Sequence, residues 1–170
     1  IAGANVSDLN ITSANDSFVV LENSGASIST INIAGSGTLS LIGALPNSIT
    51  TINAGTSSTS FTVSTGTAGA TITGSSANDV IVLGGGTNNV DSGNGNDAIT
   101  LSTGNDTVNT GSGSDTVTAS SGTNNITTGA SGDQITLSGG TNTVNSGASN
   151  DQLTISGGTN NIDTESGNDQ

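Results

Sequence analysis

The chain has 170 residues, no lysine, arginine or histidine, two aromatic residues and a formal net charge of −13. This negative charge excludes ordinary nucleic-acid binding and argues against docking on anionic lipid. The sequence also has no apolar run that approaches the ~18 residues of a membrane span. So few large apolar residues cannot build a compact sphere, and such a composition is typical of disorder unless those residues recur at a regular spacing.

The first part of the chain, residues 1–73, predicts irregular coils with few acids. The tetrapeptide Ser-Ala-Asn-Asp occurs at 13–16 and again at 76–79, and this separation fits three coils averaging ~21 residues. Pairs of apolar residues separated by one residue continue between them, at Phe18/Val20, Leu39/Leu41, Phe61/Val63 and Ile81/Leu83. Ile33, Ile52 and Ile72 are expected to form the opposite wall. We therefore predict degenerate β-solenoid coils of ~20–22 residues here.

The second part, residues 74–170, predicts a regular roll with an 18-residue coil. "GGGTNNVDSGNGNDAITL" from Gly84 is followed by "STGNDTVNTGSGSDTVTA" from Ser102, and the pattern continues to the end of the sequence. Each coil has two halves, and each half is a polar loop followed by a short extended piece. One half carries the apolar pairs Ile81/Leu83, Ile99/Leu101, Val117/Ala119, Ile135/Leu137 and Leu153/Ile155; the other carries Ile72, Val90, Val108, Ile126, Val144 and Ile162. This alternation predicts an all-β, right-handed parallel β-solenoid with two short strands per coil around a thin core.

The sixth position of each half forms two columns when the coils are stacked. One column is Asp79, Asp97, Asp115, Asp133, Asp151 and Asp169; the other is Ala70, Asn88, Asp106, Asn124, Asn142 and Asn160. Neighbouring carboxylates ~5 Å apart repel by ~1 kcal/mol in water and ~3 kcal/mol at an effective dielectric constant of 20. A lone aspartate in such a turn is best explained as solvated. Six at a fixed spacing beside Gly-x-Gly loops instead predict cations between the coils.

The available ligands identify the cation. They are carboxylate, amide, hydroxyl and backbone oxygens, with no histidine or cysteine for zinc or copper, and such flexible oxygen cages suit Ca²⁺ better than Mg²⁺. Asparagine lowers cation affinity but can form a hydrogen-bonded ladder. We therefore expect several calcium ions in a row along the aspartate edge only. Asp106 is open to two interpretations, a lone extra site or a solvated acid, and the second is favoured.

The nonapeptides "SGNGNDAIT" (92–100) and "TGSGSDTVT" (110–118) resemble the RTX, or haemolysin-type, calcium-binding repeats, most of all those of bacterial surface-layer (S-layer) proteins. The resemblance implies calcium between stacked loops of a β-roll. Its ligands would be the six aspartates of the first column and the carbonyls of Gly93, Gly95, Gly111 and Gly113. It also implies type I secretion and folding outside the cell. The asparagines on the second edge depart from the family pattern.

Catalysis is not expected, because the chain has no histidine, cysteine, lysine or tyrosine and its acids form a uniform column. The leading hypothesis is a structural module of a secreted bacterial surface protein, a fragment of a longer chain contributing to an S-layer. Its partners would be copies of itself in an extracellular array, with no nucleic acid and no membrane insertion, and a cell-surface glycan is a candidate through other parts of the parent chain. The alternatives are the secretion and folding module of an RTX exoprotein, or a stalk or ice-binding segment of an adhesin. Ice binding would use the rank Thr87, Thr123, Thr141 and Thr159, which Asn105 interrupts.

Overall fold

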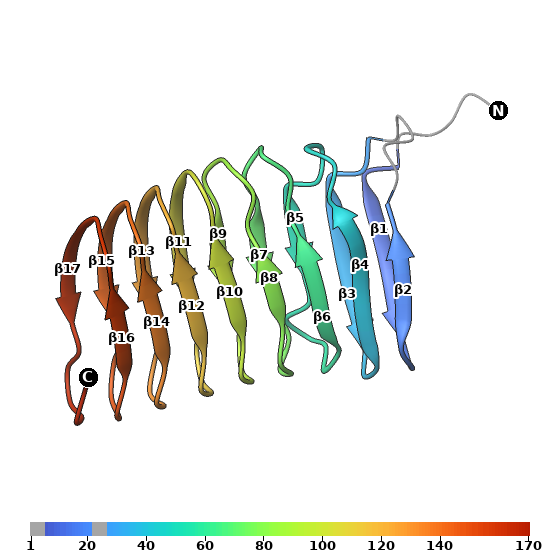
Figure 1. The fold of residues 1–170 in the computed structure, drawn as a ribbon. Helices are drawn as coiled ribbons and strands as arrows, with labels where there is room; N and C mark the ends of the chain where they lie inside the picture. Colours follow the sequence, from blue (N-terminus) through green and yellow to red (C-terminus); the bar gives the residue numbers. More distant parts are fainter. Residues whose placement is uncertain (1–5, 22–26) are drawn as a thin grey trace.

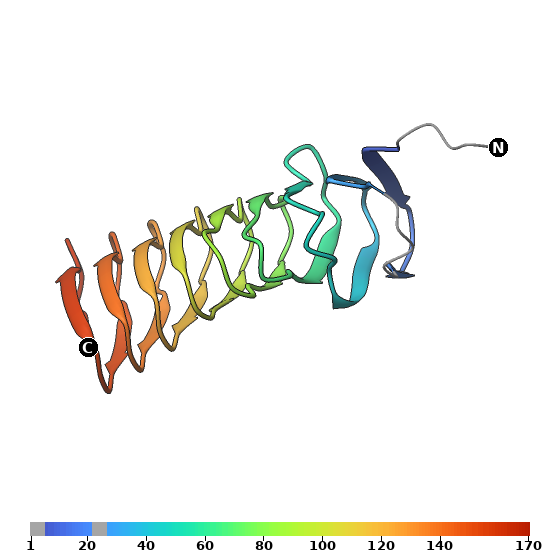
Figure 2. The same cartoon turned by 90° about the horizontal axis from the view of Figure 1, so that it is seen from above.

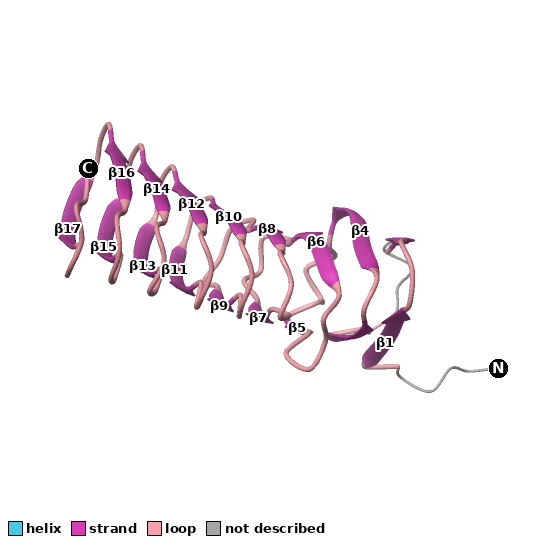
Figure 3. Ribbon diagram, turned by 90° about the horizontal axis from the view of Figure 1, so that it is seen from below, coloured by secondary structure: helices cyan, strands magenta, loops and turns pink. Residues whose placement is uncertain are grey.

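The computed structural model describes residues 6–21 and 27–170, and these form a parallel β-solenoid, as predicted. Successive strands alternate between two sheets, so that the chain winds along a rod from β1 to β17 (Figure 1). The described residues contain no helix long and apolar enough to cross a membrane. Figure 3 shows the two sheets as two separate rows of strands running the length of the rod.

The first sheet has nine strands, paired in parallel in the order in which they occur in the chain. They are β1 (Asp8–Ser13), β3 (Thr30–Gly35), β5 (Thr51–Asn53), β7 (Thr71–Thr73), β9 (Asn89–Asp91), β11 (Asn105–Asn109), β13 (Thr123–Thr127), β15 (Thr141–Asn145) and β17 (Thr159–Asp163). The second sheet has eight: β2 (Ser17–Val20), β4 (Thr38–Ala44), β6 (Ser60–Ser64), β8 (Val80–Val82), β10 (Ala98–Leu101), β12 (Thr116–Ala119), β14 (Gln134–Leu137) and β16 (Gln152–Ile155). Figure 2 shows the coils successively stacked along the axis.

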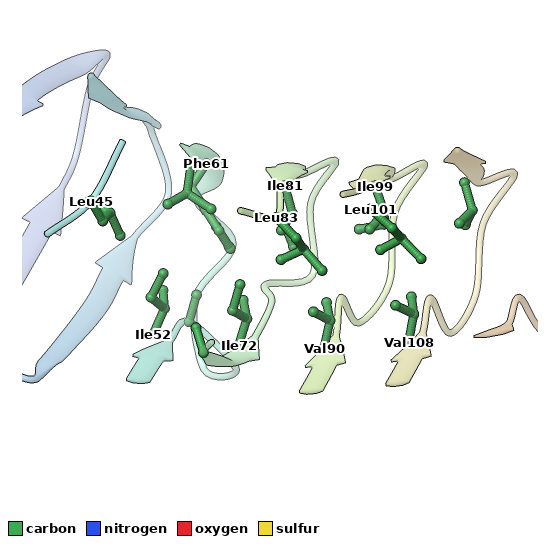
Figure 4. Close-up of a cluster of buried hydrophobic side chains, with 14 of the residues drawn as sticks. Leu45, Ile52, Phe61, Ile72, Ile81, Leu83, Val90, Ile99, Leu101 and Val108 are labelled. Carbon is green, nitrogen blue, oxygen red and sulfur yellow. The ribbon is translucent and has the colours of Figure 1, made fainter. Parts of the chain in front are cut away.

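The core is a thin apolar layer between the two sheets. The side chains of Ile81 in β8 and of Leu83 just after it point toward those of the first sheet, such as Ile72 and Val90 (Figure 4). In the regular coils the apolar side chains that line the core from Ile72 to Val144 are at most 5 % exposed. The last coil is less covered, and Ile155 is 47 % exposed.

The strand pairing shows directly how the length of the coils changes. Asp8 pairs with Thr30, Thr30 with Thr51 and Thr51 with Thr71, so that each of these coils is shorter than the one before it. The first step is 22 residues, and from Thr71 onward every step is 18 residues. The predicted change from longer to regular coils is therefore present in the backbone.

The prediction that Phe18 and Val20 face the core is wrong. Phe18 is 74 % exposed and Val20 is 59 % exposed, whereas Val19 is partly buried against the core. A shift of one residue along a strand moves every side chain to the other face, and such a shift separates the actual register from the one expected from the sequence.

The cause of the shift is the length of the first coils. Ser17 pairs with Leu39, and Leu39 pairs with Phe61, which lies beside Asp79 in the next coil. Ser17, and not Asp16, is therefore in register with Asp79. The two Ser-Ala-Asn-Asp segments consequently do not occupy equivalent positions in their coils.

The pair Phe61/Val63 is buried as predicted, but it is not in line with Ile81/Leu83. Val63 pairs with Ile81, two positions from the alignment made on the sequence. Phe61 therefore occupies the place that Asp79 occupies in the next coil, and its backbone N–H donates to Asp79 Oδ1 at 2.9 Å. The aspartate column thus ends, on its N-terminal side, against an aromatic side chain.

The opposite wall also differs from the prediction. Ile52 and Ile72 stack as expected, but their partner in the preceding coil is Ile31. Ile33 is buried as well, and it pairs with Ile11. This region is the most apolar part of the core, since it also contains the buried side chains of Leu39, Leu41, Leu45 and Ile49.

Candidate metal centre

The aspartate column lies inside the roll rather than on its surface. Each aspartate follows a glycine-rich or serine-rich turn, and those from Asp79 to Asp151 directly precede a strand of the second sheet, so that their side chains point inward like the apolar residues after them. Five of the six are at most 2 % exposed, namely Asp79, Asp97, Asp115, Asp133 and Asp151. Asp169, in the last turn, is partly buried. The spacing in the sequence brings these residues together, and the structure adds that they are desolvated.

One oxygen of each carboxylate binds the backbone of the preceding coil. Asp115 Oδ1 accepts the N–H of Asp97 at 2.8 Å, and Asp133 Oδ1 accepts the N–H of Asp115 at 2.8 Å. The same contact recurs at every step from Phe61 to Asp169, with distances of 2.8–3.0 Å. These bonds hold the carboxylates in a line along the rod.

The second oxygen has no partner in four consecutive coils. Oδ2 of Asp97, Asp115, Asp133 and Asp151 is buried and accepts no hydrogen bond. A buried carboxylate oxygen without a donor costs a large desolvation free energy, so native proteins pair such oxygens with hydrogen bonds or metal ions. The row of open oxygens therefore fits a row of cations between successive turns.

Asp79 differs from the aspartates that follow it. Its Oδ2 accepts the Ser75 N–H at 2.9 Å, and its Oδ1 accepts the Ser75 hydroxyl at 3.1 Å as well as the Phe61 N–H. Ser75 stands where the next turn has Gly93. Hydrogen bonds thus satisfy both oxygens of Asp79, and the open part of the column begins at Asp97.

Burial changes the acidity of these carboxyl groups. It raises the pKa of Asp79, Asp97 and Asp133 to about 6 from the usual 3.8, and it also raises the pKa of Asp115. Hydrogen bonds from backbone N–H groups act in the opposite direction, as does the Ser75 hydroxyl at Asp79. Charge repulsion within the column adds to burial, because Asp79 and Asp115 both raise the pKa of Asp97. Without a counter-ion, the ionised column is therefore unfavourable.

The predicted glycine ligands lie in the turns before the aspartates. Gly93, Gly95, Gly111 and Gly113 all have positive φ, which explains why glycine is needed there. At Gly111 a Cβ atom would lie 1.9 Å from the Gly93 carbonyl oxygen, so successive turns approach too closely for any side chain. The Gly93 carbonyl already accepts the Ser112 N–H at 3.1 Å, and its second lone pair remains available.

A column of hydroxyl groups beside the aspartates was missed in the sequence. Ser92, Thr110 and Thr128 are buried, and each donates its hydroxyl to the backbone carbonyl 18 residues later, at 3.0–3.1 Å. The available signal was the serine or threonine that opens each aspartate-bearing nonapeptide, at Ser92, Thr110, Thr128 and Ser146.

The opposite edge of the roll carries the predicted asparagine ladder. Asn124 Nδ2 donates to Asn142 Oδ1 at 2.7 Å, and Asn142 Nδ2 donates to Asn160 Oδ1 at 2.7 Å. Each amide also donates to the carbonyl of the third residue before it, at 3.0 Å. From Asn124 onward each side-chain nitrogen is therefore satisfied along the rod without a cation, whereas Asn124 Oδ1 accepts no hydrogen bond.

Asp106 is not a solvated acid, which corrects the favoured interpretation of the sequence. It is 1 % exposed and lies within the asparagine column, where its Oδ1 accepts two hydrogen bonds from Asn88. The rod is also less acidic outside than the net charge suggests, since six of the thirteen acids are buried.

Among the described residues no three carboxylates converge on one point. A cation on the aspartate edge would therefore take carboxylate oxygens from two neighbouring coils and complete its shell with backbone carbonyls. Ca²⁺ accepts such mixed sets of six to eight oxygens. The donor set and the unpartnered oxygens together fit calcium.

Comparison with known protein families agrees with this chemistry. The family model for the RTX calcium-binding nonapeptide repeat (4 copies) matches residues 65–99, 93–126, 100–135, 118–153 and 138–170, which together span 65–170. The matched region contains the whole aspartate column and leaves out the longer coils at the start of the chain. Comparison with curated proteins and with solved structures gives no significant match.

Proposed function

Because the chain belongs to the family of RTX calcium-binding nonapeptide repeats, we propose that its aspartate edge holds a row of calcium ions and that the resulting rod is a structural part of a bacterial surface layer. The unpartnered, buried Oδ2 atoms of four successive aspartates carry the first half of this proposal. Asp97, Asp115, Asp133 and Asp151 would supply carboxylate oxygens, with Asp79 and Asp169 at the two ends of the row. Carbonyls of the turns, including those of Gly93, Gly95, Gly111 and Gly113, would complete each shell.

Bound calcium would supply positive charge in the gaps between coils. The residues of the chain do the rest: the Oδ1 bonds to the preceding backbone fix each carboxylate, and the positive-φ glycines bring successive turns close together. Metal binding then becomes a source of folding free energy, because the ligands converge only in the rolled chain.

Asp115→Asn is expected to weaken calcium binding in the two gaps beside residue 115. The amide oxygen can still accept the Asp97 N–H, so the change removes charge and little else. Isothermal titration calorimetry on the full chain should show fewer tight sites. Asp91→Asn is the matched control, because Asp91 is an exposed acid outside the column. Equal calcium binding by the two variants would contradict the assignment.

The RTX β-roll is a structural fold, and RTX repeat proteins are typically secreted extracellular proteins. Three features of this chain suit a lattice component: a rigid rod, exposed faces built from Thr, Asn and Ser, and no cationic residue. The remaining exposed acids, such as Asp91 and Asp163, repel neighbouring copies over about a Debye length of ~8 Å at physiological salt. Close side-by-side packing would therefore need bridging cations.

We expect the parent protein to form an extended extracellular array with copies of itself, and we expect the array to separate when calcium is chelated. Electron microscopy of the cell surface before and after chelation, followed by return of calcium, tests this. Monovalent salt alone should not restore the array, since it screens charge without rebuilding the turns. A parent protein that stays monomeric at high concentration in millimolar calcium would instead support an adhesin stalk or the secretion module of an exoprotein.

One observation favours ice binding as a second candidate. On the outer face of the nine-stranded sheet, Thr123, Thr141 and Thr159 are in register, and Asn105 continues the same rank. These residues are exposed and regularly spaced at ~4.8 Å. Thermal hysteresis in solutions of the calcium-loaded chain would support this candidate over the lattice.

A further inference from the structure

The asparagine ladder is interrupted at one step, between Asp106 and Asn124. These two residues are paired in register on β11 and β13. At the two following steps an Nδ2 group donates to the Oδ1 of the next coil, at 2.7 Å in both cases. Asp106 has no amide hydrogen to donate. As a result, Asp106 Oδ2 and Asn124 Oδ1 are both buried and both without a hydrogen-bond partner.

The geometry of the ladder shows what is missing. Asn88 Nδ2 donates to Asp106 Oδ1 at 2.8 Å, so the step before the interruption is complete. Asp106 Oδ1 accepts the Asn88 N–H just as Asn88 Oδ1 accepts the Ala70 N–H, so Asp106 Oδ2 takes the place of the Asn88 side-chain nitrogen. One hydrogen on Asp106 Oδ2 would supply the donor that Asn124 Oδ1 lacks and would leave neither oxygen open.

We propose that Asp106 is a proton-binding site: in the folded roll its carboxyl group is protonated on Oδ2 and donates to Asn124 Oδ1, so that a neutral acid takes the place of an amide in the ladder. The step transfers one proton from solvent to the carboxylate during folding and breaks no covalent bond.

The charge balance favours a proton over a divalent cation at this step. On the aspartate edge each gap lies between two carboxylates, whereas the gap after Asp106 has one carboxylate and one neutral amide. A divalent cation there would have carboxylate oxygens from one coil only, whereas a single proton makes the group neutral. No lysine, arginine or histidine exists in the chain to form an ion pair instead.

The titratable groups around Asp106 do not oppose this assignment. Of the two strands packed beside it, β9 carries only Asp91, which is exposed and pairs with Asn109, and β13 carries none. Across the core, β10 and β12 carry none, and Asp97 and Asp115 precede them at the opposite turn. Burial raises the pKa of Asp106, and the two hydrogen bonds from Asn88 lower it by less.

The sign of the pH effect follows from a pKa that is higher in the folded state. Stability from this group is fully present at low pH and is lost as pH rises through the folded pKa, because ionisation leaves two buried oxygens without a hydrogen-bond donor. An amide at position 106 would keep its donor at every pH.

The direction in which Asp106→Asn changes the Tm therefore tests the proposal. In the full chain with saturating calcium, this substitution should raise the Tm by a few degrees near neutral pH, and the difference from the parent chain should vanish at acid pH, below the folded pKa of Asp106. Asp91→Asn, which makes the same chemical change at an exposed position, should leave the Tm almost unchanged at both pH values.

Two further measurements can contradict the proposal. A calcium titration should show the same number of ions bound by the parent chain and by Asp106→Asn; loss of one ion, with a lower Tm, would mean that Asp106 is a metal ligand. Carboxyl ¹³C NMR should show the Asp106 signal titrating at a higher pH than exposed aspartates. A signal that stays ionised down to the ordinary aspartate range would overturn the proposal.

Discussion

Removing calcium is expected to abolish most of the β structure of residues 74–170. Without the metal, four buried carboxylate oxygens from Asp97 to Asp151 have neither a donor nor a counter-ion, and the core of these coils holds too few apolar side chains to offset that cost. Circular dichroism of the full chain during titration with EGTA measures the loss, which should reverse when calcium is added in excess.

The control for this experiment is ionic strength at fixed calcium. Sodium chloride screens exposed charges and should leave the spectrum almost unchanged, because the column is buried. A chain whose spectrum ignored EGTA, and in which no bound metal was found, would contradict the calcium row. Partial loss is also informative, since coils 27–65 have an apolar core and no buried acid, and they should persist.

Lowering the pH is expected to refold the calcium-free chain in part. The pKa of Asp79, Asp97 and Asp133 is about 6 in the folded roll, against 3.8 for an ordinary aspartate. The folded state therefore binds more protons than the unfolded chain between about pH 4 and 6, and the free energy of unfolding rises as the pH falls through this window. One pKa step corresponds to about 1.4 kcal/mol, so the three groups together contribute several kcal/mol.

The measurement is circular dichroism in EGTA from neutral pH to about pH 4, where protons take over part of the role of calcium. In saturating calcium the trend should reverse, because acid then displaces the metal. A calcium-free chain that became less structured on acidification would show that burial of the carboxylates is not what opposes folding. Asp115→Asn should need less acid to refold, since one charge is already absent from its column.

Most of the fold could be predicted from the 18-residue period of the regular coils. From residue 66 onward the spacing of glycine, aspartate and aliphatic residues is uniform, and both the core residues and the two sixth-position columns follow from it. The aspartate column follows from the sequence spacing alone, because parallel stacking brings equivalent positions of successive coils together.

The failures lie where the coil length changes. The separation between the two Ser-Ala-Asn-Asp segments predicts three coils averaging ~21 residues, whereas the second sheet takes two long steps, to Leu39 and to Phe61, and then a shorter one. Because of the resulting shift by one position, the side chains of Phe18 and Val20 point outward and not into the core as predicted. The alignment also hid the substitution of Phe61 for the column aspartate, since no local pattern distinguishes a shift of two from no shift when apolar residues alternate.

The burial of Asp106 could not be predicted from its own nonapeptide. Its neighbours in the sequence, Asn105 and Thr107, are exposed, as they would be beside a solvated acid. What buries Asp106 is the position it shares with Asn88 and Asn124 in adjacent coils, and this becomes visible only when the column is taken as a hydrogen-bonded unit.

Phe61 determines the direction in which the calcium-free roll can refold. The coils before it keep their structure through apolar burial, so calcium-depleted chains still present the edges of β5 and β6 to the residues that follow. In a solenoid each unit contacts only its neighbours, and ordering then spreads by addition to an existing end. When calcium is added back, the β-roll is expected to extend, coil by coil, from the ordered coils before Phe61. Its recovery should therefore be first order, without a lag, at a rate independent of protein concentration, with the coil of Asp97 ordered before that of Asp151.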